Sequence, residues 1–218
     1  MTAELPKDRL WQPVTIKWFV VVFGLALGYA ILRYHLAGDI PWSDFPLYIL
    51  NKATSLAAVF FVACSYLIGR VFTWHNKDPR KLVIIKFCGL MGLSLAGIHA
   101  FMAVCVLRPA YFSKFFEDDG RLNAIGGWGL LAGILALWAL VMPGIATIPG
   151  MAKAVGGQRW KRGQRMGYFA LLMVLGHMVV FGWNGWRHPE DWNWGLPPIS
   201  LWAALVAALT IVVKLRSR

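Results

Sequence analysis

Charged side chains are scarce in this sequence, and acidic ones are the scarcest. Only 15% of the 218 residues are charged, with 22 lysines and arginines against 10 aspartates and glutamates. A soluble domain carries about 25% charged residues, so the composition excludes an ordinary soluble globular protein. The sequence also lacks a polar stretch long enough for a nucleotide- or flavin-binding domain. We therefore expect any such domain to belong to a separate chain.

Cysteine is rarer still, with three in the sequence, and its spacing argues against two kinds of structure. Cys64, Cys88 and Cys105 lie in or beside apolar runs and form no C-x-x-C or C-x-x-C-H pattern. This argues against c-type haem attachment and against a disulfide framework, and predicts that the thiols pack as small apolar side chains. The first apolar run ends at Arg33 without a small-residue cleavage site. We interpret it as a retained span and not as a signal peptide.

Long apolar runs are what the sequence has in abundance, since 58% of its residues are hydrophobic. A membrane-spanning helix needs about 20 predominantly apolar residues. The runs predict an all-α fold, a single transmembrane domain over residues 1–218. Gly24 and Gly28 form a G-x-x-x-G pattern in the first run, which predicts close helix packing. The six predicted spans cover residues 14–32, 46–68, 82–107, 123–145, 166–184 and 198–213.

The basic residues are distributed unevenly along the chain. A net charge of +12 is compatible with a nucleic-acid-binding protein, but the basic residues cluster in short loops between apolar runs. Both ends and the second and fourth loops are basic, whereas the first, third and fifth are not. This positive-inside pattern predicts that both termini face the cytoplasm. Membrane lipid is the expected environment, and we expect no nucleic-acid partner.

Two histidines lie deep inside predicted spans. His177 interrupts the uncharged run 166–184, and His99 lies in the span 82–107. The distances to Arg108 and Arg187 along the chain put both imidazoles about 13–15 Å below the outer boundary. Intramembrane ionisable residues are candidate functional residues. Two imidazoles at one depth predict the axial ligands of a haem iron, and Gly97 and Gly176 beside them would ease close approach of the cofactor. The alternative is that each histidine only hydrogen-bonds a neighbouring helix.

Three cations are candidates for binding the haem propionates. Arg108 and Arg187 lie at the outer boundary, where arginines also serve as simple anchors. Lys52 enters the second span from outside, at about the depth of the proposed haem, and could either extend outward or pair with a propionate. The remaining histidines, His35, His75 and His188, lie at span boundaries or in loops, where a solvated histidine is the ordinary interpretation.

A family resemblance rests on two segments. R-K-L-V-I-I-K-F-C-G-L-M-G-L-S-L-A-G-I-H, residues 80–99, resembles the third span of the ferric-reductase-like transmembrane domain. W-K-R-G-Q-R-M-G-Y-F-A-L-L-M-V-L-G-H, residues 160–177, resembles its fifth span. Within that superfamily, the likeness is closest to the bacterial haem-binding subunit of the periplasmic methionine sulfoxide reductase system. The resemblance implies that His99 and His177 are the ligands of the outer haem.

The family commonly has a second histidine nearer the cytoplasm on each of these helices. This sequence has Ile85 or Lys86 on one helix and Gln164 on the other, and neither Lys86 nor Gln164 is a usual haem ligand. We therefore expect a single haem b per chain, in the outer half of the bilayer. The predicted function is that of an electron-transfer subunit that passes electrons between quinol, or a partner subunit, and an acceptor at the outer face. The likeness to a bacterial subunit also implies a bacterial inner membrane. The alternatives are a non-catalytic accessory or assembly subunit with the same fold and, more distantly, a small transporter.

Overall fold

The computed structural model describes residues 13–75 and 79–216, and within these ranges it is built from helices. The described residues form no β-strand, only an isolated bridge between Phe116 and Leu122. Two π-helices, η2 (Ile31–Leu36) and η4 (Phe45–Ile49), lie on either side of the loop that connects the first two spans. The long helices are α1 (Pro13–Ala30), α2 (Leu50–His75), α3 (Pro79–Val106), α5 (Ala124–Ile145), α7 (Gly157–Arg187) and α8 (Ile199–Arg216).

Short elements cap the two ends of the bundle. They are η3 (Trp42–Asp44), α4 (Pro109–Phe112), η5 (Ser113–Phe115), α6 (Met151–Val155), η6 (Pro189–Asp191) and η7 (Asn193–Gly195). Six helical segments of the described chain are long and apolar enough to cross a membrane. The predicted all-α, six-span architecture is therefore confirmed. The largest difference in bounds is at α7, which begins at Gly157 and not near residue 166, because the basic segment before the apolar run is helical too.

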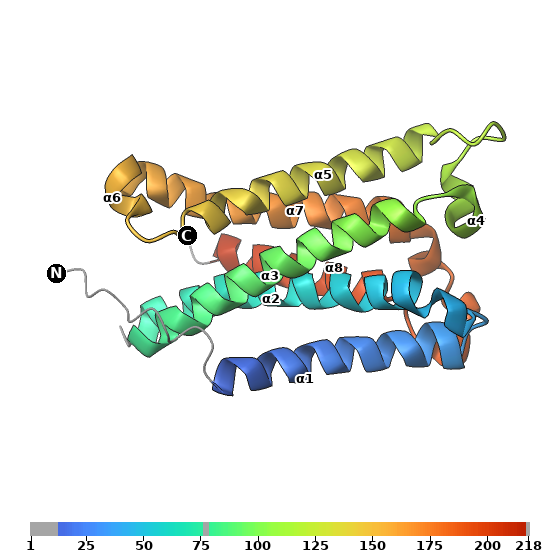
Figure 1. Cartoon of the computed structure of the whole chain (residues 1–218), viewed down its shortest axis with the longest axis horizontal. Helices are drawn as coiled ribbons and strands as arrows, with labels where there is room; N and C mark the ends of the chain where they lie inside the picture. Colours follow the sequence, from blue (N-terminus) through green and yellow to red (C-terminus); the bar gives the residue numbers. More distant parts are fainter. Residues whose placement is uncertain (1–12, 76–78, 217–218) are drawn as a thin grey trace.

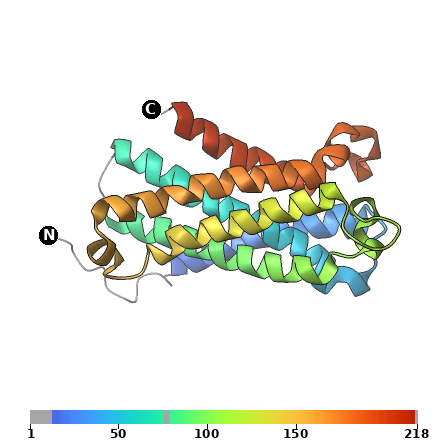
Figure 2. The same ribbon diagram turned by 90° about the horizontal axis from the view of Figure 1, so that it is seen from above.

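The long helices pack as two pairs joined by α8. Helix α2 packs along α3, and α5 packs along α7, while α8 lies against both α2 and α7. Figure 1 shows α1 at one edge of the bundle, where it contacts α2, and α5 at the opposite edge. Seen from above in Figure 2, α8 diverges from the bundle toward its C-terminal end. Helices α3 and α7 both contact α5, but α3 and α7 are not packed closely against each other.

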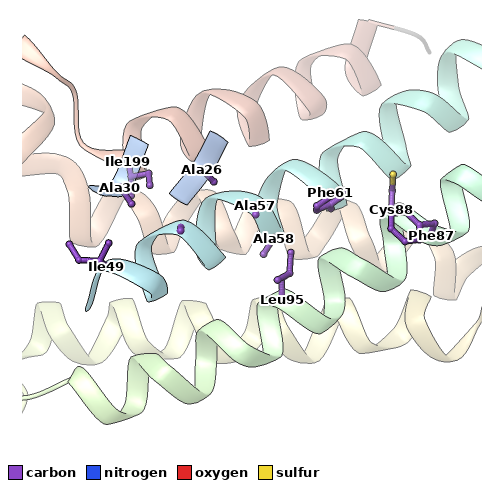
Figure 3. Close-up of a cluster of buried hydrophobic side chains, with 11 residues drawn as sticks. Ala26, Ala30, Ile49, Ala57, Ala58, Phe61, Phe87, Cys88, Leu95 and Ile199 are labelled. Atoms are coloured by element: carbon purple, nitrogen blue, oxygen red, sulfur yellow. The ribbon is translucent and has the colours of Figure 1, made fainter. Parts of the chain in front are cut away.

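Small side chains form much of the interior. Ala30, Ala53 and Ala57 are fully buried in the cluster that joins α1, α2 and α3, and Figure 3 shows Ala57 and Phe61 on α2 near Leu95 of α3. Ala139 and Ala207 are fully buried in a second cluster that joins α5, α7 and α8. Small residues let helix backbones approach closely, which is how helices associate where lipid removes the hydrophobic driving force.

The G-x-x-x-G pattern of the first span does not pack against another helix of the described chain. A side chain added at Gly24 or at Gly28 would meet no atom within 4 Å. Leu25, between them, is 70% exposed. Helix α1 lies at the edge of the bundle, and this part of it faces outward. The prediction of close packing at these glycines is therefore wrong for the described chain.

The two ends of the bundle differ in composition. Helix α1 begins and α8 ends at one end, together with α6 and the start of α7 (Figure 1). Lys153, Arg159 and Lys161 belong to this basic end. The opposite end carries α4 and the tryptophan-rich segment before α8. The even number of spans agrees with both termini on one side, and the cytoplasmic location of that side stays a prediction.

Candidate functional site

His99 lies on the inward face of α3. It follows Leu95 by four residues and precedes Met102 by three, and both neighbours are buried. Residues three and four apart share one face of a helix, so the imidazole belongs to the stripe that packs against α2. Its Nδ1 lies 2.6 Å from Oδ1 of Asn51, a buried residue of α2. Asn51 was not among the predicted site residues, because nothing in its local sequence indicates its partner.

His177 lies on α7 against α5. Its Nδ1 is 2.8 Å from the carbonyl oxygen of Gly129, and its ring stacks edge-to-face on Phe181 with centroids 4.9 Å apart. A Cβ added at Gly133 would lie 2.9 Å from Nδ1 of the histidine, and one added at Gly129 would lie 2.4 Å from the Phe181 ring. The G-x-x-x-G pattern of the fourth span thus provides the space that the imidazole and the Phe181 ring occupy.

Gly97 and Gly176, the glycines expected to make room for the cofactor, lie beside open space. A side chain added at Gly97 or at Gly176 would meet no atom within 4 Å. Gly97 instead lines an open apolar groove of about 650 Å³ between α3 and α5, together with Ser94 and Phe101. This groove is on a different face of α3 from His99. The role predicted for Gly97 and Gly176 stays a prediction, whereas Gly129 and Gly133 lie directly beside Phe181 and His177.

The hydrogen bonds of the two imidazoles fix which nitrogen is available. In each ring Nδ1 faces an oxygen acceptor, so Nδ1 carries the proton of the neutral imidazole. Within the described chain, neither Nε2 atom has a hydrogen-bond partner, and its lone pair is free to bind a metal. At metal sites, a histidine that binds the metal through one ring nitrogen usually donates a hydrogen bond from its other ring nitrogen to an oxygen of the protein.

The two histidines are neighbours in space although they lie on helices that are not closely packed. Each imidazole lies within electrostatic range of the Lys52 ammonium, and His99 lies within the same range of His177. The joint role of His99, His177 and Lys52 in one site stays a prediction. A haem supplies four equatorial nitrogens of its own and needs only two axial ligands from the protein. The described chain offers two such nitrogens, one on α3 and one on α7.

Lys52 occupies an aromatic pocket at the outer end of the site. Its Nζ lies 5.1 Å from the ring centroid of Tyr48, 5.4 Å from that of Phe112 and 5.8 Å from that of Tyr34. Such distances are in the range of cation–π attraction. The ion pairs found in the described chain, Arg121–Asp119 and His188–Glu190, are both exposed, so Lys52 has no acidic partner there.

The two predicted boundary arginines lie farther out. Arg108 and Arg187 are exposed. The guanidinium of Arg108 lies 4.9 Å from the Tyr111 ring centroid, and that of Arg187 lies 5.8 Å from the Trp183 ring centroid. No contact joins either arginine to the histidines. These positions are typical of anchors at a membrane interface, and their role toward a haem stays a prediction.

A buried cation, Arg33, was not predicted. Its side chain is only 8% exposed, on the π-helix η2 that extends α1. One guanidinium nitrogen, Nη1, donates to the carbonyl oxygen of Leu196, and the group lies 5.3 Å from the Tyr34 ring centroid. The Nε atom of Arg33 is the one buried side-chain nitrogen or oxygen of the described residues without a hydrogen-bond partner. In sequence, Arg33 resembles any arginine at the end of a span.

Aromatic side chains of α2 and α7 pack together toward the basic end of the bundle. Tyr66 of α2 donates from its hydroxyl to the carbonyl oxygen of Gln164 at 2.8 Å, and its ring lies 4.5 Å from that of Tyr168. A Cβ at Gly167 would overlap the Tyr66 hydroxyl, at 1.7 Å. Gln164 lies within α7. Neither Lys86 nor Gln164 is brought into a ligand pair here.

The other histidines are engaged locally. His35 bonds the carbonyl oxygen of Ile40 through Nδ1 and packs on Trp42, while His188 pairs with Glu190 at the surface. The side chain of His75 lies outside the described residues.

Comparison with known proteins shows a distant likeness to metalloreductases. No family model matches the chain. It is 23% identical to the metalloreductase STEAP2 of Homo sapiens over 237 aligned positions, which cover 94% of this chain and 48% of that protein, and equally so to the Mus musculus protein. The chain thus spans about half the length of the curated relatives it matches. The likeness supports the coarse placement in the ferric-reductase-like transmembrane superfamily, and it does not extend to the bacterial subunit that the sequence suggested.

Proposed function

We propose that this chain is a membrane-embedded b-type cytochrome that holds one haem b between His99 and His177. The observation that carries the proposal is the pairing of both Nδ1 atoms with oxygen acceptors on neighbouring helices, which leaves both Nε2 atoms free. Once bound, a haem supplies one-electron redox chemistry. The distant relatives, which are metalloreductases by name, support a role in electron transfer.

The chain's own residues would orient and insulate the cofactor. Asn51 and the Gly129 carbonyl hold each imidazole in the ligand tautomer and increase its basicity. Phe181 and the buried stripe of α3 keep water from the histidines, and a low dielectric strengthens the effect of nearby charge on a redox potential. Lys52 is the proposed propionate contact, and Arg108 and Arg187 are outer candidates for the same role.

The direction of electron flow is part of the proposal. We infer that electrons enter from a quinol or from a partner subunit and leave to an acceptor at the outer face. The names of the relatives suggest a metal ion as that acceptor, which would be substrate and not cofactor. The Tyr66–Gly167 contact and the absence of a second histidine pair support a single haem per chain. A bacterial inner membrane and a lipid environment complete the proposal.

A reduced-minus-oxidised visible spectrum of the purified chain tests this proposal. We expect a low-spin haem b spectrum and a pyridine haemochrome ratio near one haem per chain. His99→Ala and His177→Ala should each abolish the low-spin spectrum, while the matched variant His188→Ala should retain it. A chain that binds no haem would favour the accessory-subunit alternative. A reproducible ratio of two would show that an inner site exists.

Reduction kinetics test the donor separately. The haem of the isolated chain should be reduced by a quinol analogue or by a co-purified subunit, and not by NADPH alone. Rapid reduction by NADPH in the absence of any other protein would contradict the proposed donor. Oxidation of the reduced haem by a ferric or cupric chelate, added outside sealed vesicles, would support the metal-ion acceptor, and no reaction with either would refute it.

A further inference from the structure

Two cations flank a single aromatic ring at the outer end of the candidate site. The guanidinium carbon of Arg33 lies 5.3 Å from the Tyr34 ring centroid, and Nζ of Lys52 lies 5.8 Å from the same centroid. Arg33 and Tyr34 belong to η2, whereas Lys52 belongs to α2. The two cations therefore come from different helical elements. The fold therefore concentrates positive charge beside Tyr34.

No acidic side chain neutralises this pair within the described chain. Its ion pairs, Arg121–Asp119 and His188–Glu190, are at the surface. Asp44, which lies near the same aromatic group, accepts a hydrogen bond from the Tyr111 hydroxyl at 2.8 Å. Burying a charge without a partner is costly. A buried guanidinium of this kind is therefore expected to meet an anion that the chain itself does not supply.

The free edge of Arg33 identifies the chemistry of that anion. Nη1 is occupied by the Leu196 carbonyl, whereas Nε is buried and has no partner. The edge of the guanidinium formed by Nε and Nη2 is the one that binds a carboxylate through two parallel hydrogen bonds. Arg33 is only 8% exposed and its Nε atom is buried, so Nε faces the protein interior and not bulk solvent.

The position of the pair relates it to the histidines. Lys52 follows Asn51, which holds His99, and its charge interacts with both His99 and His177. A ligand held by those histidines and carrying carboxylates on one edge would direct them toward this end of the bundle. We propose, on the basis of the haem site proposed above, that Arg33 and Lys52 together bind the propionate carboxylates of the haem. Arg33 is the buried, bidentate member of the pair.

The test compares haem b with its dimethyl ester, in which the propionates carry no charge. The unsubstituted chain, Arg33→Gln, Lys52→Gln and the control Lys153→Gln, an exposed lysine at the opposite end of the bundle, are each loaded with either cofactor, and the rate of haem loss to excess apomyoglobin is measured. We expect Arg33→Gln and Lys52→Gln to lose haem b about tenfold faster, the effect of one hydrogen bond to a charged group. The same variants should lose the dimethyl ester no faster than the unsubstituted chain.

The controls separate a binding role from a structural one. Arg33→Lys keeps the charge and should recover part of the retention, and a preserved low-spin spectrum in each variant shows that the bundle is folded. Equal acceleration with both cofactors, or no acceleration with either, would overturn the inference. In the second case Arg33 would bind another anion, such as a lipid phosphate. Failure of the unsubstituted chain to bind haem would instead overturn the proposed function, and this inference with it.

Discussion

Nδ1 of His99 lies 2.6 Å from Oδ1 of Asn51, which joins α3 to α2 at the depth of the candidate site. Asn51 is buried and its neighbour in sequence, Lys52, directs its ammonium into the aromatic pocket of Tyr34, Tyr48 and Phe112. One turn of α2 therefore contributes both a support for a proposed ligand and a charge near it.

Replacing Asn51 should weaken the proposed haem site without unfolding the chain. Asn51→Ala removes the acceptor that fixes the His99 tautomer. Loss of a group that hydrogen-bonds a metal-binding histidine typically lowers the affinity for the metal roughly 10–100-fold. Haem affinity, measured by titration of the apoprotein, should fall in that range. Ser65→Ala, which removes a hydroxyl on the same helix, is the matched control and should change nothing. Equal affinity in Asn51→Ala and the unsubstituted chain would contradict the role of Asn51.

A methyl group at Gly133 should displace His177. The added Cβ would lie 2.9 Å from Nδ1 of His177, too close for an ordinary contact, so the ring or α5 must move. We expect Gly133→Ala to lose the low-spin spectrum or to shift it markedly. Gly127→Ala lies on the same helix, where an added Cβ meets nothing within 4 Å, and should leave the spectrum intact. Similar spectra for the two variants would show that His177 does not depend on the close approach of α5.

Lys114, in η5 outside the spans, should titrate abnormally. Burial, with a smaller contribution from the Lys52 charge, lowers the pKa of Lys114 below its ordinary value. The folded state therefore disfavours its protonated form, and the stability it contributes is present above the ordinary pKa and is lost as the pH falls through the lowered one. In Lys52→Met the pKa of Lys114 should rise.

The pH dependence of Lys114 acetylation, followed by mass spectrometry, measures this shift. The acetylation profile of Lys114 should move to higher pH in Lys52→Met, because only the neutral amine reacts. Lys153, at the opposite end of the bundle, provides the internal control and should react alike in both proteins. An unchanged Lys114 profile would mean that the Lys52 charge does not reach it.

The loop charges predict that both termini face the cytoplasm. A reporter fused after Arg218 should therefore lie in the cytoplasm, and one inserted at Asp118, in the loop before α5, should lie outside. Paired phosphatase and fluorescent-protein fusions distinguish the two compartments, because each reporter is active on only one side. The same compartment for both sites would contradict the six-span arrangement, and an exchange of the two would reverse the orientation alone.

The sequence by itself determined the number of spans and pointed to the two intramembrane histidines. The length of an apolar run has to match the thickness of the bilayer, so spans can be read directly from hydropathy. A histidine in such a run stands out for the same reason, because hydrocarbon offers its nitrogens no water. These are local properties, which need no knowledge of which helices are neighbours.

Only the tertiary structure decided what each of these residues meets. The pattern G-x-x-x-G occurs at Gly24–Gly28 and at Gly129–Gly133, yet the first pair faces open space and the second adjoins His177 and Phe181. Asn51 and His99 are 48 residues apart in the chain, and the burial of Arg33 depends on the carbonyl of Leu196. Contacts of this kind arise when separate helices pack, and helical periodicity within one segment carries no information about its partner.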